Sequence, residues 1–226
     1  MTNQPEFQSA NRANTSFLAN MEKRLLIRIA HRLPAWVNSD HLTTLGFTAL
    51  IATGVLYWQG RMNRLEIILA LICLALNWFG DSLDGTLARV RNQQRPRYGF
   101  YVDHVLDAVG TMFLMAGLAF SGFMTPVVAG VFLIAYLLLS IEIYLATYAI
   151  GTFHLSHWNF GPTELRILLA IGTIVALFRP HALIAGRMYL LFDVGFAIGT
   201  VGLLLVLGQA VIEHSRILYK METLAR

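Results

Sequence analysis

Charged residues are scarce in this sequence. Only 13% of the 226 residues are Asp, Glu, Lys or Arg, and 56% are hydrophobic, whereas a soluble domain usually carries about 25% charged residues. The mean hydropathy is +0.59, and a soluble fold of this size has too little interior to bury so much apolar chain. This composition excludes intrinsic disorder, a fibrous repeat and an ordinary soluble domain. We therefore expect an integral membrane protein.

The sequence also lacks the signals for internal disulfides, for a cleaved leader and for flexible linkers. The one cysteine, Cys73, lies in an apolar run and has no partner for an internal bridge, so we interpret it as a buried apolar residue. The first 15 residues are polar, and no short hydrophobic segment with a small-residue cleavage site follows them, so no removable signal peptide is expected. Without a Gly/Ser linker or a repeat, we expect residues 1–36 to form a polar N-terminus with an interfacial helix, and residues 37–226 to form one membrane domain.

Six stretches are long and apolar enough to cross the hydrocarbon core, which needs about 20 helical residues. The expected spans are 41–59, 63–89, 98–121, 125–149, 163–178 and 188–212. The segment from Phe17 to Arg32 differs, because apolar residues recur every four positions and basic residues occupy the other faces. This pattern predicts an amphipathic helix in the headgroup layer. The expected fold class is an all-α membrane protein with six spans and an N-terminal interfacial helix.

The distribution of Lys and Arg predicts the orientation in the membrane. With the N-terminus inside, 13 of the 17 Lys and Arg residues lie on the cytoplasmic side and 4 on the other, in agreement with the positive-inside rule. Both termini are then cytoplasmic. The net charge of +4 follows from this topology and from attraction to anionic lipid, so a nucleic-acid partner is not expected.

Four aspartates fall at one predicted depth. Asp81 and Asp84 lie near the cytoplasmic end of the second span, and Asp103 and Asp107 near the start of the third. Spacings of three and four place each pair on one helix face. Neither span contains a lysine to neutralise them. Because ionisable groups inside spans indicate function and oxygen ligands favour hard cations, we predict a site for two Mg²⁺ or Mn²⁺ ions on the cytoplasmic side.

Small residues and an arginine accompany these aspartates. The first pair is followed by Gly85, Ala88 and Arg89, and Gly99 lies one turn before the third aspartate. Glycine inside a helix costs about 1 kcal/mol relative to alanine, so Gly85 indicates close approach by a ligand or by the backbone of a neighbouring helix. Arg89 can contact a phosphate. The stretch 81–107 reads D-x2-D-G-x2-A-R, nine further residues, and G-x3-D-x3-D. At every fixed position it resembles the signature of the CDP-alcohol phosphotransferase family.

This resemblance implies a reaction and the roles of the site residues. Members of the family transfer a substituted phosphate from a CDP-linked donor to an alcohol and release CMP. The resemblance implies that the four aspartates hold the metals, that Gly85, Ala88, Arg89 and Gly99 line the CDP site, and that Asp107 is the general base. His104 is a rival base, because the eukaryotic choline/ethanolamine phosphotransferases place a histidine directly after the third aspartate.

Two interpretations of the substrates stay open. The short chain with six expected spans looks like the compact microbial members, which use CDP-diacylglycerol and a small alcohol. The alternative is transfer of phosphocholine or phosphoethanolamine from a CDP-alcohol to diacylglycerol, because residues 148–166 are similar to the matching segment of the eukaryotic enzymes. For the acceptor or its head group the candidates are Glu142, Glu164 and Arg166. Glu164 equally suits the positive end of a helix.

Other interpretations are less well supported. Intramembrane prenyltransferases also bind pyrophosphate through aspartate pairs, but they lack the Gly-x2-Ala-Arg continuation. A divalent-cation transporter would hold its acids at mid-span. His154 and His157 are interpreted as loop residues, and Asp193 as bound to a neighbouring helix or to an interfacial group. The pair Gly195 and Gly199 is the only indication of a homodimer.

Overall fold

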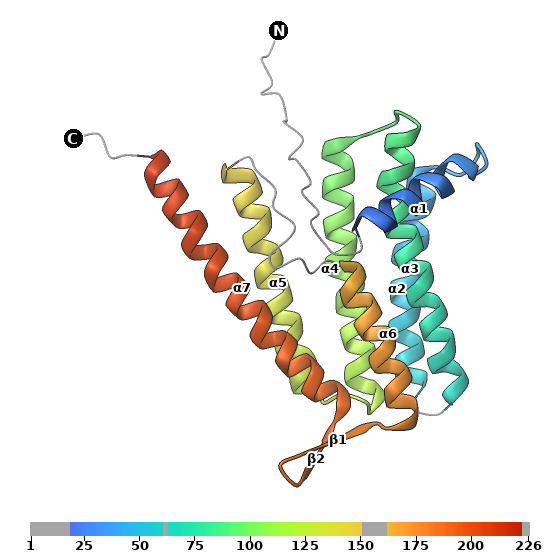
Figure 1. The fold of residues 1–226 in the computed structure, drawn as a ribbon, viewed down its shortest axis with the longest axis vertical. Helices are drawn as coiled ribbons and strands as arrows, with labels where there is room; N and C mark the ends of the chain where they lie inside the picture. Colours follow the sequence, from blue (N-terminus) through green and yellow to red (C-terminus); the bar gives the residue numbers. More distant parts are fainter. Residues whose placement is uncertain (1–18, 61–62, 151–161, 223–226) are drawn as a thin grey trace.

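The structure, a computed structural model, describes residues 19–60, 63–150 and 162–222. Within these ranges it contains seven α-helices and one two-stranded antiparallel hairpin (Figure 1). In chain order the elements are α1 (Ala19–Arg32), α2 (Ser39–Gln59), α3 (Arg64–Val90), α4 (Pro96–Ser121), α5 (Pro126–Ile150), α6 (Pro162–Phe178), β1 (His181–Ile184), β2 (Arg187–Leu190) and α7 (Leu191–Met221).

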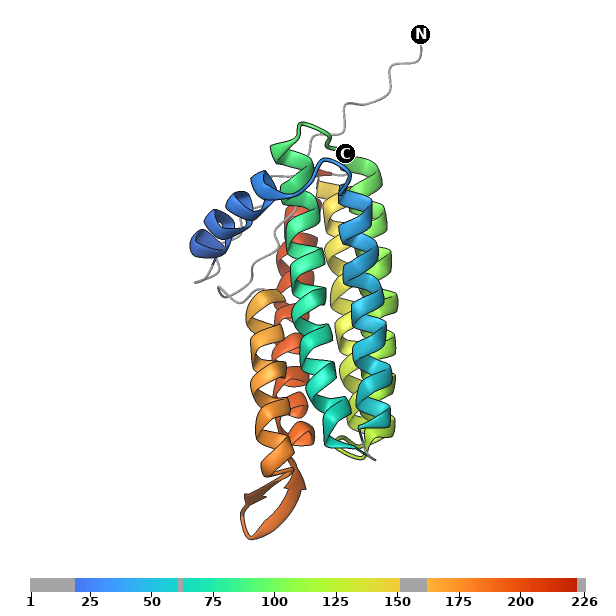
Figure 2. The ribbon, with the colours of Figure 1, turned by 90° about the vertical axis from the view of Figure 1, so that its right-hand side faces the viewer.

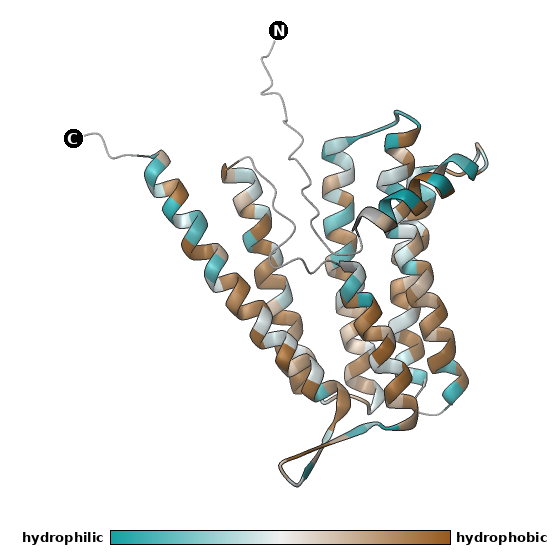
Figure 3. Ribbon diagram, in the orientation of Figure 1, coloured by the Kyte–Doolittle hydropathy of each residue, from teal (hydrophilic) through white to brown (hydrophobic). Residues whose placement is uncertain are grey.

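The long helices have the length and composition of membrane-spanning segments. Four of them, α3, α4, α5 and α7, are long and apolar enough to cross a membrane. Their outward surfaces carry large apolar side chains that are exposed in the isolated chain, such as Leu145 at 64% and Ile198 at 70%. Figure 3 shows the apolar residues filling the middle and one end of the bundle, with hydrophilic residues gathered toward the end that holds α1. The chain is an all-α integral membrane protein.

The first and fifth expected spans, which correspond to α2 and α6, have a weaker basis. Helix α6 has 17 residues, which is about 25 Å of helix and less than the ~30 Å hydrocarbon core. Helix α2 has 21 residues but carries four threonines and an acidic first turn. The helices occupy the positions expected for 41–59 and 163–178, and whether both cross the membrane stays a prediction.

Helix α2 is the principal neighbour of both α3 and α4. Glycines at the contacts allow the helix backbones to come this close. A Cβ on Gly117 of α4 would lie 1.9 Å from the carbonyl oxygen of Gly54 on α2, and a Cβ on Gly80 of α3 would lie 2.6 Å from the amide nitrogen of Gly46. Small residues at helix contacts allow the backbones of membrane helices to touch. The packing therefore holds α3 and α4 against the two sides of one helix.

The N-terminal helix α1 lies across one end of the bundle (Figures 1 and 2). Leu26 and Ala30 are buried, and they pack against Leu83 and Leu87 of α3. Met21, by contrast, is 69% exposed. The apolar surface expected to face lipid is therefore divided between contact with α3 and an exposed side. A helix is present at Ala19–Arg32, and its interfacial character in the headgroup layer stays a prediction.

The last expected span is displaced by the hairpin. Residues 188–190, predicted to open that span, belong to β2, and the helix begins at Leu191. The reason is the turn between the strands, where Ala185 and Gly186 have φ of 48° and 80°, as a two-residue hairpin turn requires. At its other end α7 continues to Met221, beyond the predicted residue 212.

Helices α5 and α7 pack mainly on each other, and in Figure 1 they diverge from the other helices toward the end that holds α1. Asp193 in the first turn of α7 accepts a hydrogen bond of 2.7 Å from the backbone N–H of Thr125, which lies in the connection between α4 and α5, directly before α5. A Cβ on Gly199 would lie 3.3 Å from the side chain of Phe132. That glycine serves contact between helices of one chain, so it offers no argument for a dimer.

Candidate active site

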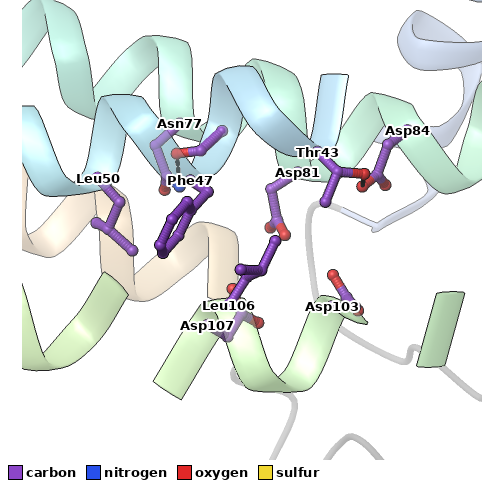
Figure 4. Close-up of a pocket in the computed structure, with 10 residues that line it drawn as sticks. Thr43, Phe47, Leu50, Asn77, Asp81, Asp84, Asp103, Leu106 and Asp107 are labelled. Atoms are coloured by element: carbon purple, nitrogen blue, oxygen red, sulfur yellow. Dashed lines mark hydrogen bonds between the residues drawn. The ribbon is translucent and has the colours of Figure 1, made fainter. Parts of the chain in front are cut away.

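Three of the predicted metal ligands converge in space. Carboxylate oxygens of Asp81 on α3 and of Asp103 and Asp107 on α4 lie within 4.8 Å of one another, and all three side chains are partly buried. Figure 4 shows the three side chains turned toward one space between the helices. The helix spacing places each acid on the inward face, and the packing of α3 and α4 on α2 brings the two faces together.

The fourth aspartate is held slightly apart. Asp84 accepts a hydrogen bond of 2.7 Å from the hydroxyl of Thr43 on α2 and one from the backbone N–H of Gly85. Ser39, in the first turn of α2, donates to the backbone carbonyl of Asp84 at 2.9 Å. In Figure 4 the carboxylate of Asp84 is turned toward Thr43. Thr43 had no signal in the sequence, because a threonine in an apolar helix is ordinary unless its neighbours are known.

An arginine from α6 contacts one of the aspartates, Asp81. Nη2 of Arg166 lies 2.6 Å from Oδ2 of Asp81, and its Nε donates to Asn77 at 2.9 Å. Asn77 is 2% exposed and donates in turn to the carbonyl of Gly46 at 2.9 Å. This chain of bonds orients Asp81 from three helices. Arg166 was predicted on the acceptor side, and the structure places it beside the aspartates. Asn77 was not predicted at all.

A cavity of about 320 Å³ lies beside the aspartates at the end of α3 and the start of α4. Its walls include the four residues predicted for the CDP site, Gly85, Ala88, Arg89 and Gly99, together with Asp84 and Asp103. Among the described residues, no side chain or neighbouring helix comes within 4 Å of a Cβ built on Gly99. The glycines, the alanine and the arginine of the signature thus line one cavity, next to two of its aspartates.

A charged pair borders the outer part of this cavity. Arg95 pairs with Asp40 at the start of α2, and its guanidinium lies 4.3 Å from the ring centre of Tyr98. All three residues line the cavity. Both partners of the pair are about half exposed, so the contribution of the pair to stability is small. Its position indicates that these charges face whatever enters the cavity.

His104 stands on α4 between Asp103 and Asp107 in the sequence. Its Nδ1 lies 2.6 Å from the backbone carbonyl of Phe100, and its ring meets the ring of Tyr144 on α5 edge-on at 4.7 Å. A carbonyl only accepts, so Nδ1 carries the proton in this arrangement and Nε2 is the basic atom of the neutral ring. The two candidate bases are thus presented from one helix.

The remaining predicted acceptor residues lie in two different places. Glu142 on α5 is bound by His214 of α7, with Oε1 2.6 Å from Nδ1, and it is not among the residues that line the cavity. Glu164 is half-buried in the first turn of α6, two residues before Arg166. His154 and His157 lie outside the described residues.

Comparison with known proteins decides the family. The model of the CDP-alcohol phosphatidyltransferase family matches residues 36–208. The chain belongs to this family. It is therefore a membrane transferase of the CDP-alcohol phosphotransferase class, which acts in phospholipid biosynthesis. No curated protein sequence matches it.

Among solved structures the fold is similar to that of the Mycobacterium tuberculosis phosphatidylinositol phosphate synthase PgsA1, in a crystal structure with CDP-DAG bound. The TM-score is 0.63 at 17% identity, over 90% of this chain and 100% of the other. At this identity the likeness concerns the fold alone. In the CDP-alcohol phosphatidyltransferase described here, the signature residues thus lie on a fold that a solved synthase also has.

Proposed function

We propose that the protein transfers a phosphatidyl group from CDP-diacylglycerol to a small alcohol and releases CMP. The observation that carries the proposal is the cavity of about 320 Å³, because its walls combine the signature residues Gly85, Ala88, Arg89 and Gly99 with two of the aspartates. A structure of similar fold holds CDP-DAG. The cavity is lined by residues at the end of α3 and the start of α4, two helices that are apolar enough to cross a membrane, so a lipid donor and a water-soluble alcohol can meet there.

The aspartates fit a divalent metal centre. Their oxygens lie within 4.8 Å of one another, and three half-buried carboxylates at this distance repel unless cations lie between them. We propose that Asp81, Asp84, Asp103 and Asp107 hold two Mg²⁺ or Mn²⁺ ions. When bound, such ions spread the charge of the pyrophosphate and of the leaving phosphate.

The residues around the centre have distinct tasks. Arg166 and Asn77 fix the carboxylate of Asp81, and Thr43 fixes that of Asp84. Outer contacts of this kind orient metal ligands. Gly85 and Gly99 leave room for the nucleotide, and Arg89 supplies a planar cation for a phosphate.

The reaction exchanges one phosphorus–oxygen bond for another. The hydroxyl oxygen of the alcohol bonds to the phosphorus that carries diacylglycerol, and the bond from that phosphorus to CMP breaks. The hydroxyl proton must pass to a base. Asp107, a member of the aspartate cluster, is our choice, and His104 is the rival, because the neutral ring presents Nε2.

For the alcohol acceptor we propose only where it binds. Arg166 and Glu164 are two residues apart at the start of α6, and Arg166 reaches the aspartates. We propose that the alcohol enters beside them. Glu142 lies against His214 between α5 and α7, so a role in holding a cationic head group would require that pair to open. We also propose that both termini and the active site face the cytoplasm, as the basic residues predict.

A radiochemical assay tests the proposal. The purified protein would be incubated with Mg²⁺ and labelled CDP-diacylglycerol, or separately with CDP-choline and diacylglycerol, and CMP release measured over a panel of small alcohols. We expect release from CDP-diacylglycerol that depends on an alcohol. Release only from CDP-choline with diacylglycerol would support the aminoalcohol phosphotransferase instead, and Asp84→Asn is the control for background hydrolysis.

A further inference from the structure

A single carboxylate oxygen on α1 accepts hydrogen bonds from two other helices. Oε1 of Glu22 lies 2.8 Å from the indole nitrogen of Trp78 and 3.2 Å from the hydroxyl of Ser82, both on α3. It also lies 2.9 Å from the hydroxyl of Thr163 on α6. The donors Trp78 and Thr163 are 56 and 141 residues away from Glu22 in the sequence.

The three donors lie close in sequence to the two residues of the ion pair between Arg166 and Asp81. On α3, Trp78 lies three residues before Asp81, and Ser82 directly follows it. On α6, Thr163 lies three residues before Arg166, which is the spacing that places two residues on one face of a helix. Glu22 therefore connects α3 to α6 about one helical turn from the 2.6 Å bond between Arg166 and Asp81.

Holding α1 in place does not need this carboxylate. Leu26 and Ala30 of α1 are buried against α3. The guanidinium of Arg91 binds the carbonyls that follow α1, those of Leu33 at 3.0 Å and Pro34 at 2.9 Å. Helix α6, in contrast, has a small contact with α3 compared with that of α2. The element that depends on the Glu22 bonds is thus the start of α6.

We propose that Glu22 is a positioning residue of the active site. By binding Thr163 on one side and Trp78 and Ser82 on the other, it sets the start of α6 against α3, so that Arg166 reaches Asp81 and leaves the carboxylate oriented for a metal. Outer contacts of metal ligands commonly change metal affinity 10- to 100-fold. This inference rests on the proposed function, because it takes the aspartates to be the metal centre.

Metal binding without turnover gives the direct test. Mn²⁺ binding to the full-length protein in detergent would be measured by the loss of the free-ion EPR signal. We expect Glu22→Ala to weaken Mn²⁺ binding about tenfold, at the lower end of the range for outer contacts. Glu22→Gln retains an oxygen acceptor at Oε1 and should stay within about twofold of wild type. Lys23→Ala removes an exposed neighbouring charge on the same helix and should change nothing.

A second pair of variants isolates the bond between α1 and α6. Thr163→Val removes the hydroxyl at nearly constant volume and should weaken Mn²⁺ binding severalfold, whereas Thr163→Ser keeps the hydroxyl and should bind normally. If the effect passes through Arg166, then Glu22→Ala should weaken binding less than twofold further in an Arg166→Ala protein. The two Thr163 variants keep the test informative even if Glu22→Ala proves poorly folded, because they leave Glu22 in place.

The outcomes separate this inference from the proposed function. Wild-type Mn²⁺ affinity in folded Glu22→Ala and in Thr163→Val would overturn the inference, as would an equal loss in Glu22→Gln. A wild-type protein that binds Mn²⁺ but releases no CMP from CDP-diacylglycerol would refute the proposed function, and the Mn²⁺ comparison would still decide the role of Glu22.

Discussion

Asp81 and Arg166 stand 85 residues apart in the sequence and form an ion pair of 2.6 Å at the border of the aspartate cluster. Both side chains are largely buried, at 21% and 17% exposed. A second guanidinium nitrogen of Arg166, Nε, donates to the side-chain oxygen of Asn77. The same planar cation therefore binds both a carboxylate and an amide. This relationship gives the cluster a fixed cation beside any metal that it holds.

Replacing this arginine should weaken the metal site. Arg166→Ala removes the bonds to Asp81 and Asn77, and we expect the Mg²⁺ concentration for half-maximal activity to rise about 10- to 100-fold. Arg166→Lys keeps the charge but not the planar fork and should recover only part of the loss. The measurement is a Mg²⁺ titration of CMP release. An unchanged Mg²⁺ requirement in Arg166→Ala would contradict the role of this pair.

The fourth aspartate should be essential although it lies outside the tight cluster. Asp84→Asn should abolish CMP release while the protein still inserts and folds, because one fewer like charge relieves repulsion. Near-normal turnover at saturating Mg²⁺ would refute its assignment as a ligand.

The hydroxyl that binds Asp84 provides a graded test of the same site. Thr43→Val removes the 2.7 Å bond to that carboxylate, and we expect about a tenfold loss of Mg²⁺ affinity. Thr43→Ser keeps the donor and is the matched control. A Thr43→Ser protein as impaired as Thr43→Val would show that side-chain packing, and not the hydrogen bond, matters here.

Two substitutions distinguish the candidate bases. If Asp107 accepts the proton of the alcohol, Asp107→Asn should reduce turnover by about 10²–10⁴, and His104→Ala by less than tenfold. Since Asp107 also belongs to the metal cluster, CDP binding should be measured in both variants. A lost ligand weakens nucleotide binding, and a lost base leaves it unchanged. The opposite order of rates would assign the base to His104.

Substitutions at two glycines should affect donor binding and protein stability separately. A methyl group on Gly99 meets no neighbouring helix in the part of the chain that the structure describes, so Gly99→Ala should fold normally. Because Gly99 lines the cavity, this substitution should raise the KM for the CDP donor severalfold. A methyl group on Gly117 would meet a backbone oxygen of Gly54 at 1.9 Å, and Gly117→Ala should destabilise the protein by at least about 1–3 kcal/mol. Thermal unfolding in detergent and donor titrations would measure the two effects. Unfolding of Gly99→Ala below the wild-type temperature would contradict this assignment.

The sequence by itself determined the membrane class, four of the spans and the convergence of three aspartates. These features follow from short-range rules. A long apolar run has to cross the membrane as a helix, and a spacing of three or four places acids on one face. The signature residues that line the cavity, Gly85, Ala88, Arg89 and Gly99, were identified by resemblance to a family signature, and that was possible because they all lie within residues 81–107. The hairpin that replaces the start of the last expected span was missed, since its turn depends on two residues with positive φ.

Only the tertiary structure decided which side chains support the aspartates. Thr43, Asn77, Arg166 and Glu22 reach the site from four helices, and no periodicity connects positions that are 41 to 141 residues apart. The same applies to Glu142, whose partner His214 lies on α7, the last described helix. A residue's face on its own helix is encoded locally, but its partner depends on how whole helices pack, and that packing is decided by backbone contacts at Gly46, Gly54, Gly80 and Gly117 and by the sum of many weak side-chain contacts.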